Sequence, residues 1–213
     1  MTHETRPPGS RAGPTPPMKS HAESRSDPLV ATPLRLTSRT AISDLSEATW
    51  ERSCFYASPI GEPESEQRKH SDLLLESLIE PAVKALDPKM GVTRSDQLSS
   101  SPITARVIEH VFRSGLMIAD LSFHNPSVLY EVGLRHTAGG PCVLISRTAD
   151  QIPSNLRDVR LVKVDTAELW AFWSNLESCR AEIVNHARWA LSSEGRDSSP
   201  VQQLFPGYHK YIR

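Results

Sequence analysis

From residue 53 onward, short continuous apolar runs alternate with longer segments in which apolar residues recur every three or four positions. Continuous runs are typical of strands buried on both faces, and the three-to-four spacing is typical of helices with one apolar face. The runs predict five strands, at 53–58, 91–95, 116–119, 142–145 and 159–164. The last run alternates between apolar and polar residues, which favours an edge of the sheet. This order predicts a flavodoxin-like, doubly wound α/β fold, with a mostly parallel five-stranded sheet and helices on both faces.

Capping signals set the bounds of the helix between the third and fourth strands. Asn125 followed by Pro126 is typical of a helix start, because the asparagine side chain accepts from free N–H groups and proline fits the first turn. The Gly-Gly-Pro segment at 139–141 predicts its end.

Two other helices carry weaker signals. The helix before the second strand is expected to begin at Ser65, and Pro81 is expected to kink it or to begin a second segment. The last helix is expected over 166–191. Its predicted inward positions are Leu169, Phe172, Trp173, Leu176, Ile183 and Val184.

The composition divides the chain into three parts. Residues 1–48 are rich in proline and serine and show no apolar period, so we expect a disordered leader, with a docking or targeting tail as the alternative. A short helix over 37–50 is expected to pack on the domain that follows, at 49–191. Residues 192–213 are expected to form a linker and an aromatic C-terminal tail that folds back onto the domain or meets a partner.

Charge and cysteine content exclude several classes of protein. The net charge of −1 gives no electrostatic reason to expect nucleic acid or an anionic membrane as partner. No apolar run approaches the roughly 20 residues of a membrane span, and the N-terminus has no signal-peptide core, so we expect a cytoplasmic protein. Cys54 and Cys142 fall in predicted buried strands and Cys179 in a predicted helix, and no two cysteines form a Cys-x-x-Cys pair. We therefore expect reduced thiols in the core rather than a disulfide or a metal site.

Polar residues follow several predicted strands. The segments 58–61 and 120–125, with Asp96 and Ser146, are expected to converge, because the carboxyl ends of parallel strands meet at one edge of the sheet. This region has no glycine-rich phosphate loop, no nucleophile elbow and no spacing of metal ligands. His124 and His136 are interpreted as surface or hydrogen-bonding histidines.

Glu131 is an ionisable residue within the largely apolar central helix. It stands four residues before Arg135, a spacing that is typical of a stabilising ion pair on a helix surface. The alternative is a catalytic carboxylate at the edge where ligands bind. The spacing by itself does not decide between the two.

Four segments of the chain resemble a bacterial family that joins nucleoside 2-deoxyribosyltransferase-like proteins to TIR-like domains. They are CFYASPIG, SEQRKHSD, the block SPITARVIEHVFRSGLMIADLSFHNPSVLYEVGLRH, and PCVLI, over about 53–146. The most specific part combines Ala119-Asp-Leu, Asn125-Pro and Tyr130-Glu-Val-Gly133. In this family the signature holds the active-site glutamate.

The resemblance implies a role for each matching residue. Glu131 would be the catalytic carboxylate, which stabilises positive charge on a sugar or traps it covalently. The implied substrate-binding residues are Tyr56, Ser58, Gly61, Asp96, Asp120 and Asn125. No metal and no cofactor is implied, since NAD would be the substrate.

Three functions follow from the resemblance. The first is hydrolysis of NAD to nicotinamide and ADP-ribose, in a bacterial setting as an antiviral defence effector. The second is a nucleoside 2-deoxyribosyltransferase or a nucleoside or nucleotide N-glycosidase, although the loop at 122–126 is shorter than in the transferases. The third is a non-catalytic nucleotide-binding signalling module. TIR-like domains often act when assembled, so a homo-oligomer with a small nucleotide or nucleoside ligand is expected.

Overall fold

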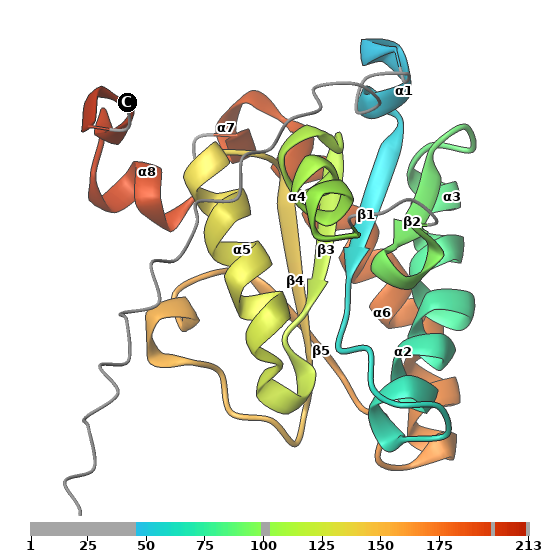
Figure 1. The fold of residues 1–213 in the computed structure, drawn as a ribbon. Coiled ribbons are helices and arrows are strands. Elements are labelled where there is room, and N and C mark those ends of the chain that lie inside the picture. The colour runs from blue at the N-terminus through green and yellow to red at the C-terminus, as the bar shows by residue number, and fades with distance from the viewer. Residues whose placement is uncertain (1–45, 99–102, 197–198, 212–213) are drawn as a thin grey trace, which may run out of the picture. The chain divides into compact units, whose positions relative to one another are not determined.

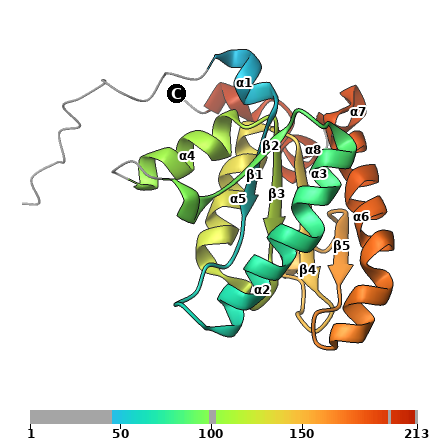
Figure 2. The ribbon, with the colours of Figure 1, turned by 90° about the vertical axis from the view of Figure 1, so that its right-hand side faces the viewer.

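A computed structural model describes residues 46–98, 103–196 and 199–211, which belong to one compact unit. Its centre is a five-stranded sheet whose strands all run in the same direction (Figures 1 and 2). The strands are β1 (Ser53–Ala57), β2 (Gly91–Arg94), β3 (Leu116–Asp120), β4 (Cys142–Arg147) and β5 (Leu161–Val164), in the order β2-β1-β3-β4-β5. This is the flavodoxin-like order, so the predicted fold class is confirmed.

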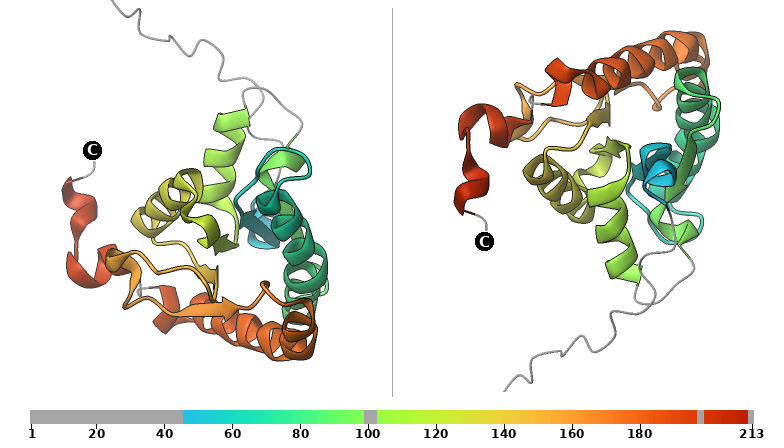
Figure 3. Two further views of the ribbon diagram at one scale, coloured as in Figure 1. Left: turned by 90° about the horizontal axis from the view of Figure 1, so that it is seen from below. Right: turned by 90° about the horizontal axis from the view of Figure 1, so that it is seen from above.

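Helices cover both faces of this sheet, as predicted. The described helices are α1 (Glu47–Glu51), α2 (Glu66–Leu74), α3 (Glu80–Leu86), α4 (Ile103–Arg113), α5 (Pro126–Ala138), α6 (Leu169–Leu191), α7 (Ser193–Arg196) and α8 (Pro200–Leu204). Figure 3 shows α4 and α5 on one face and α2, α3 and α6 on the other. Each face therefore has its own hydrophobic core.

Strand alternation explains the two cores. In β1, Cys54 and Tyr56 point toward α2, α3 and α6, whereas Phe55 and Ala57 point toward α4 and α5. All four are buried, because successive side chains of a strand face opposite sides and helices cover both. This is why the strands read as continuous apolar runs.

The capping residues of α5 act as the sequence predicts. The Asn125 side chain accepts hydrogen bonds from the backbone N–H groups of Ser127 and Val128, at 3.0 and 3.3 Å. Gly139 ends the helix with a φ of 67°, a left-handed conformation that glycine adopts without strain. Ser65 caps α2 in the same way, through the N–H of Arg68.

Pro81 interrupts the helix that begins at Glu66. A wide, π-helical turn at Leu75–Ile79 separates α2 from α3, and Pro81 lies in the first turn of α3. Proline has no N–H to donate to the carbonyl of Ser77, four residues earlier. Arg180 of α6 supplies the missing donors, with its Nε 2.9 Å and its Nη2 2.5 Å from that carbonyl oxygen.

Several elements differ in extent from their predictions. Strand β5 begins two residues later than expected and lies at an edge, as predicted, whereas α6 begins at Leu169 rather than at residue 166. At the start of α6, Leu169 and Trp173 are exposed, which corrects their predicted inward orientation. The periodicity was right for the rest of the stripe, which packs on the sheet.

The terminal regions are partly described. Of the leader expected at 1–48, residues 1–45 lie outside the described residues. Within the described part of the helix expected over 37–50, the structure has α1, which begins at Glu47. The stretch after Leu191, expected as a linker, contains the short helices α7 and α8. The tail folds back, since buried Tyr208 donates its hydroxyl proton to the carbonyl of Thr137 in α5. No helix in the described part of the chain combines the length and apolar character that a bilayer crossing needs.

Candidate functional site

A cavity of about 610 Å³ opens where the direction of strand addition reverses. The chain passes from β1 to β2 on one side and then returns to place β3 on the other side of β1. In open α/β sheets the crevice outside the carboxyl ends of such strands binds ligands. The cavity lies on the side of the sheet that α4 and α5 cover. Its lining residues are Ser58, Ile60, Ser95, Asp96, Thr104, Val107, Ile108, Asn125, Pro126, Ser127, Tyr130 and Glu131.

Glu131 reaches this cavity from the second turn of α5. No described residue forms an ion pair or a hydrogen bond with its carboxyl group. The predicted alternative, an ion pair with Arg135, is therefore wrong. Glu131 is half-buried, and this burial raises the pKa of its carboxyl group from 4.5 to about 7.

Arg135 is engaged elsewhere. Its side chain is buried, and its guanidinium donates to the carbonyls of Val111, Ser114 and Pro141, at 2.8, 2.6 and 3.1 Å. These carbonyls lie at the end of α4 and just before β4. Arg135 therefore links α5 to its neighbours and leaves Glu131 without a cation.

Four residues expected to belong to the site line the cavity together. They are Ser58, Asp96, Asn125 and Glu131. The hydroxyl of Ser58 is buried and has no hydrogen-bond partner among the described residues. The amide oxygen of Asn125 is used by the helix cap, so its NH₂ group is the part that can serve a ligand.

Asp96 is held in place by two arginines. Arg94 donates Nε–H to one carboxylate oxygen at 2.8 Å and Nη2–H to the other at 2.9 Å, and Arg68 lies 3.0 Å from the second oxygen. Burial alone would raise the pKa of Asp96, but these arginines outweigh it and lower that pKa below its ordinary value. Asp96 is therefore a fixed, ionised group at the edge of the cavity.

Tyr56, Gly61 and Asp120 do not line the cavity, which corrects the lining that we expected. Tyr56 and Asp120 are fully buried on the opposite face of the sheet, where the Tyr56 hydroxyl lies 3.5 Å from Asp120 Oδ2. Gly61 lies in the turn before α2, and a Cβ atom there would be 2.3 Å from the Ser65 hydroxyl. Gly61 therefore serves the close approach to the helix cap.

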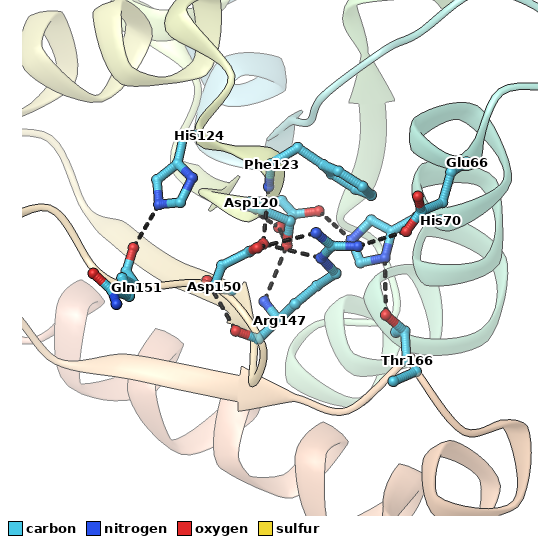
Figure 4. A network of polar contacts seen from close by, with 12 residues as sticks. Glu66, His70, Asp120, Phe123, His124, Arg147, Asp150, Gln151 and Thr166 are labelled. Atoms are coloured by element: carbon cyan, nitrogen blue, oxygen red, sulfur yellow. Dashed lines mark hydrogen bonds and ion pairs between the residues drawn. The ribbon is translucent and has the colours of Figure 1, made fainter.

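Asp120 belongs to a buried polar network, shown in Figure 4. His70 Nε2 lies 2.8 Å from Asp120 Oδ2, and the other ring nitrogen lies 3.2 Å from the Thr166 hydroxyl. The other oxygen of Asp120 accepts from the N–H and the hydroxyl of Ser122. Because Asp120 is fully buried on the face of the sheet opposite the cavity, the ribose-binding role expected of it is not supported by the geometry.

The same network fixes the loop before α5. Arg147 forms a bidentate ion pair with Asp150, at 2.9 and 3.0 Å, and stacks on the Phe123 ring at 3.6 Å (Figure 4). Asp150 also accepts from the backbone N–H of Phe123 at 2.9 Å, and Phe123 has a positive φ of 60°. His124, as predicted, is an exposed hydrogen-bonding histidine, whereas His136 is buried and makes no side-chain hydrogen bond to a described residue.

The apolar wall and the rim of the cavity were not predicted from the sequence. Ile60, Val107 and Ile108 form apolar surface, and Tyr130 is 62% exposed at the rim. Val107 and Ile108 carried the helical stripe of α4, but a stripe does not tell which of its members meet a neighbouring helix and which border a cavity. Tyr130 could have been found, since it precedes Glu131 in the signature.

The described ranges contain no group of three histidine, cysteine, aspartate or glutamate side chains that could hold a metal ion. The three cysteines are free, as predicted.

Comparison with known proteins adds little to this site. No protein-family model and no curated protein sequence matches the chain. A solved structure of a CMP N-glycosidase from Clostridium botulinum matches with a TM-score of 0.38 and 16% identity, over 59% of this chain and 98% of that chain. At this TM-score the likeness carries no argument about function. Membership of the deoxyribosyltransferase-like and TIR-like family stays a prediction.

Proposed function

We propose that the protein hydrolyses the N-glycosidic bond of a nucleotide, with NAD as substrate and Glu131 as the catalytic carboxylate. The observation that carries the proposal is the position of Glu131, unpaired and half-buried in a cavity at the ligand-binding edge of the sheet. An unpaired carboxylate in such a place costs stability, and groups of this kind cluster at functional sites.

The chemistry requires little beyond this carboxylate. As the bond between C1′ and the pyridinium nitrogen breaks, its electron pair passes to the ring, and nicotinamide leaves as a neutral molecule. The positive charge that develops on the ribose is stabilised by the Glu131 carboxylate. A water molecule then adds to C1′ and loses a proton, giving ADP-ribose, nicotinamide and H⁺.

Other lining groups can orient the sugar. The buried Ser58 hydroxyl, the Asn125 NH₂ group and the fixed Asp96 carboxylate lie around the same cavity as Glu131. Hydroxyls, amides and carboxylates are suitable partners for ribose hydroxyls. The amide and the carboxylate are both held by other contacts, so the cavity is organised before a ligand enters.

The test compares the wild type with Glu131→Gln. Purified protein is incubated with NAD and the products are separated by chromatography. We expect nicotinamide and ADP-ribose from the wild type and a loss of about 100-fold or more in Glu131→Gln. Glu76→Gln is the matched control, since Glu76 is exposed and lies outside the cavity. Equal turnover in wild type and Glu131→Gln would exclude the catalytic role.

A second candidate is an N-glycosidase for nucleosides or nucleotides with a neutral base. A pKa of about 7 leaves part of the Glu131 population protonated near neutral pH, so this group can also donate a proton to a departing base. A panel of purine and pyrimidine nucleosides and nucleotides tests this candidate. No turnover of NAD or of the panel would favour a binding module.

A further inference from the structure

An unpartnered aromatic ring stands at the rim of the cavity. Tyr130 is exposed, lines the cavity, and makes no hydrogen bond or ring contact with another described residue. It directly precedes Glu131 in α5. Ile60, Val107 and Ile108 add apolar surface to the same cavity. Such a surface fits a planar ligand that stacks on one face.

The cavity also has a net negative character. None of the described residues that line it is a lysine, arginine or histidine, and its two charged residues are Asp96 and Glu131. The charge of Asp96 is balanced locally, because Arg68 and Arg94 form ion pairs with Asp72 and Asp96. Glu131 has no such partner and remains the uncompensated charge.

We propose that Tyr130 and Glu131 together recognise a positively charged aromatic ring, and that the cavity selects an N-substituted pyridinium over a neutral ring of the same shape. The face of a tyrosine ring carries negative electrostatic potential and attracts cations. A bound cation would also compensate the buried charge of Glu131. This inference rests on the proposed function and adds a residue that determines which leaving group the cavity accepts.

The buried hydroxyl of Ser58 provides an independent sign of a ligand. Its side-chain oxygen is inaccessible to solvent, has no partner among the described residues, and belongs to a residue that is only 7% exposed. Buried hydroxyl groups are nearly always hydrogen-bonded. A ligand that carries an amide or a sugar hydroxyl beside its ring would supply the missing bond.

The test measures binding rather than turnover. 1-Methylnicotinamide and nicotinamide have nearly the same shape, but only the first is a cation, and neither has a sugar to be cleaved. Their affinities for the full-length protein are measured at pH 8 by NMR titration. We expect 1-methylnicotinamide to bind about tenfold more tightly than nicotinamide.

Variants assign this preference to particular side chains. Tyr130→Leu and Glu131→Gln are each expected to reduce the preference to less than about threefold, whereas Tyr130→Phe retains it because the ring remains. Tyr211→Leu is the matched control, since Tyr211 is an exposed tyrosine outside the cavity. Equal affinities for the two compounds, no binding of either, or an unchanged preference in Tyr130→Leu would overturn the proposal.

The two proposals fail in different ways. Selective binding of the cation without cleavage of NAD would refute the proposed hydrolysis and leave this recognition site intact. Cleavage of NAD by a protein that binds both compounds equally would refute the recognition site alone.

Discussion

The carboxyl group of Glu131 lies half-buried, and no described cation accompanies it. Its pKa is about 7 in the folded protein and 4.5 when unperturbed. Because the folded state disfavours the charged form, ionisation of Glu131 destabilises the fold. This cost is absent below pH 4.5, grows as the pH rises toward 7, and is complete above it.

Replacing Glu131 with glutamine should therefore stabilise the protein at high pH. We expect Glu131→Gln to raise the free energy of unfolding by about 1–2 kcal/mol at pH 8 and to leave it nearly unchanged at pH 4. Urea denaturation at the two pH values measures this. A loss of stability at pH 8 would instead indicate a favourable partner for the carboxylate.

Arg135 presents the opposite case, a buried cation whose partners are all backbone carbonyls. Arg135→Met should lower the free energy of unfolding by about 2–4 kcal/mol, because several buried carbonyls lose their donors. The control Arg188→Met, at an exposed position of α6, should change it by less than about 0.5 kcal/mol. Thermal or urea unfolding distinguishes the two.

These two residues show what spacing alone cannot predict. Glu131 and Arg135 are four positions apart, a separation that suits an ion pair on an isolated helix. The carbonyls that capture Arg135 come from residues 20 or more positions earlier in the chain and from the segment before β4. Such contacts depend on how α4 and α5 pack, so the local spacing predicted the wrong partner for Glu131.

At the scale of elements, the helix interrupted by Pro81 offers a test of compensation. Arg180→Ala should cost about 1–2 kcal/mol of unfolding free energy, because the Ser77 carbonyl loses its donors. In a Pro81→Ala background, residue 81 regains an N–H four residues after that carbonyl, so we expect the same substitution to cost at most about half as much. A double-mutant cycle in urea measures the coupling, and purely additive effects would contradict it.

Gly133 within α5 and Gly139 at its C-terminal cap should respond in opposite directions to substitution by alanine. Gly139 has a left-handed φ of 67°, and a Cβ atom there would lie 2.6 Å from the side chain of Gln202. Gly139→Ala should therefore cost about 1–2 kcal/mol. Gly133 lies inside the helix with open space around it, so Gly133→Ala should stabilise by about 0.5–1 kcal/mol. Denaturation midpoints compare the pair.

It was easier to predict which segments form strands and helices than to predict on which face of the sheet the side chain of a residue near a strand end lies. Continuous apolar runs identified the central strands β1, β3 and β4, because helices cover both of their faces, whereas the edge strands β2 and β5 have mixed sequences. For the same reason, nothing in those runs distinguishes the face with the cavity from the face with the second core. Tyr56 and Asp120 were expected at the site and lie on the other face, although they belong to the carboxyl ends of β1 and β3, the strands next to the cavity.

At the scale of the whole molecule, the direction of the pH dependence of activity separates the two candidate reactions. If Glu131 acts as a carboxylate on NAD, the rate should rise with pH through about 7 and then level off. If it acts as a proton donor to a neutral base, the rate should fall over the same range. Initial rates measured between pH 5 and 9 decide, and a flat profile would contradict both.

The guanidinium of Arg135 has a further consequence for how the range of molecules that fit the cavity can evolve. It fastens the end of α4 to α5 only four residues, about 6 Å along the helix, beyond Glu131. The same two helices both line the cavity, through Val107 in α4 and Tyr130 in α5. Because Arg135 joins these helices from outside the cavity, natural variation at this position can alter which molecules fit while every lining residue stays the same.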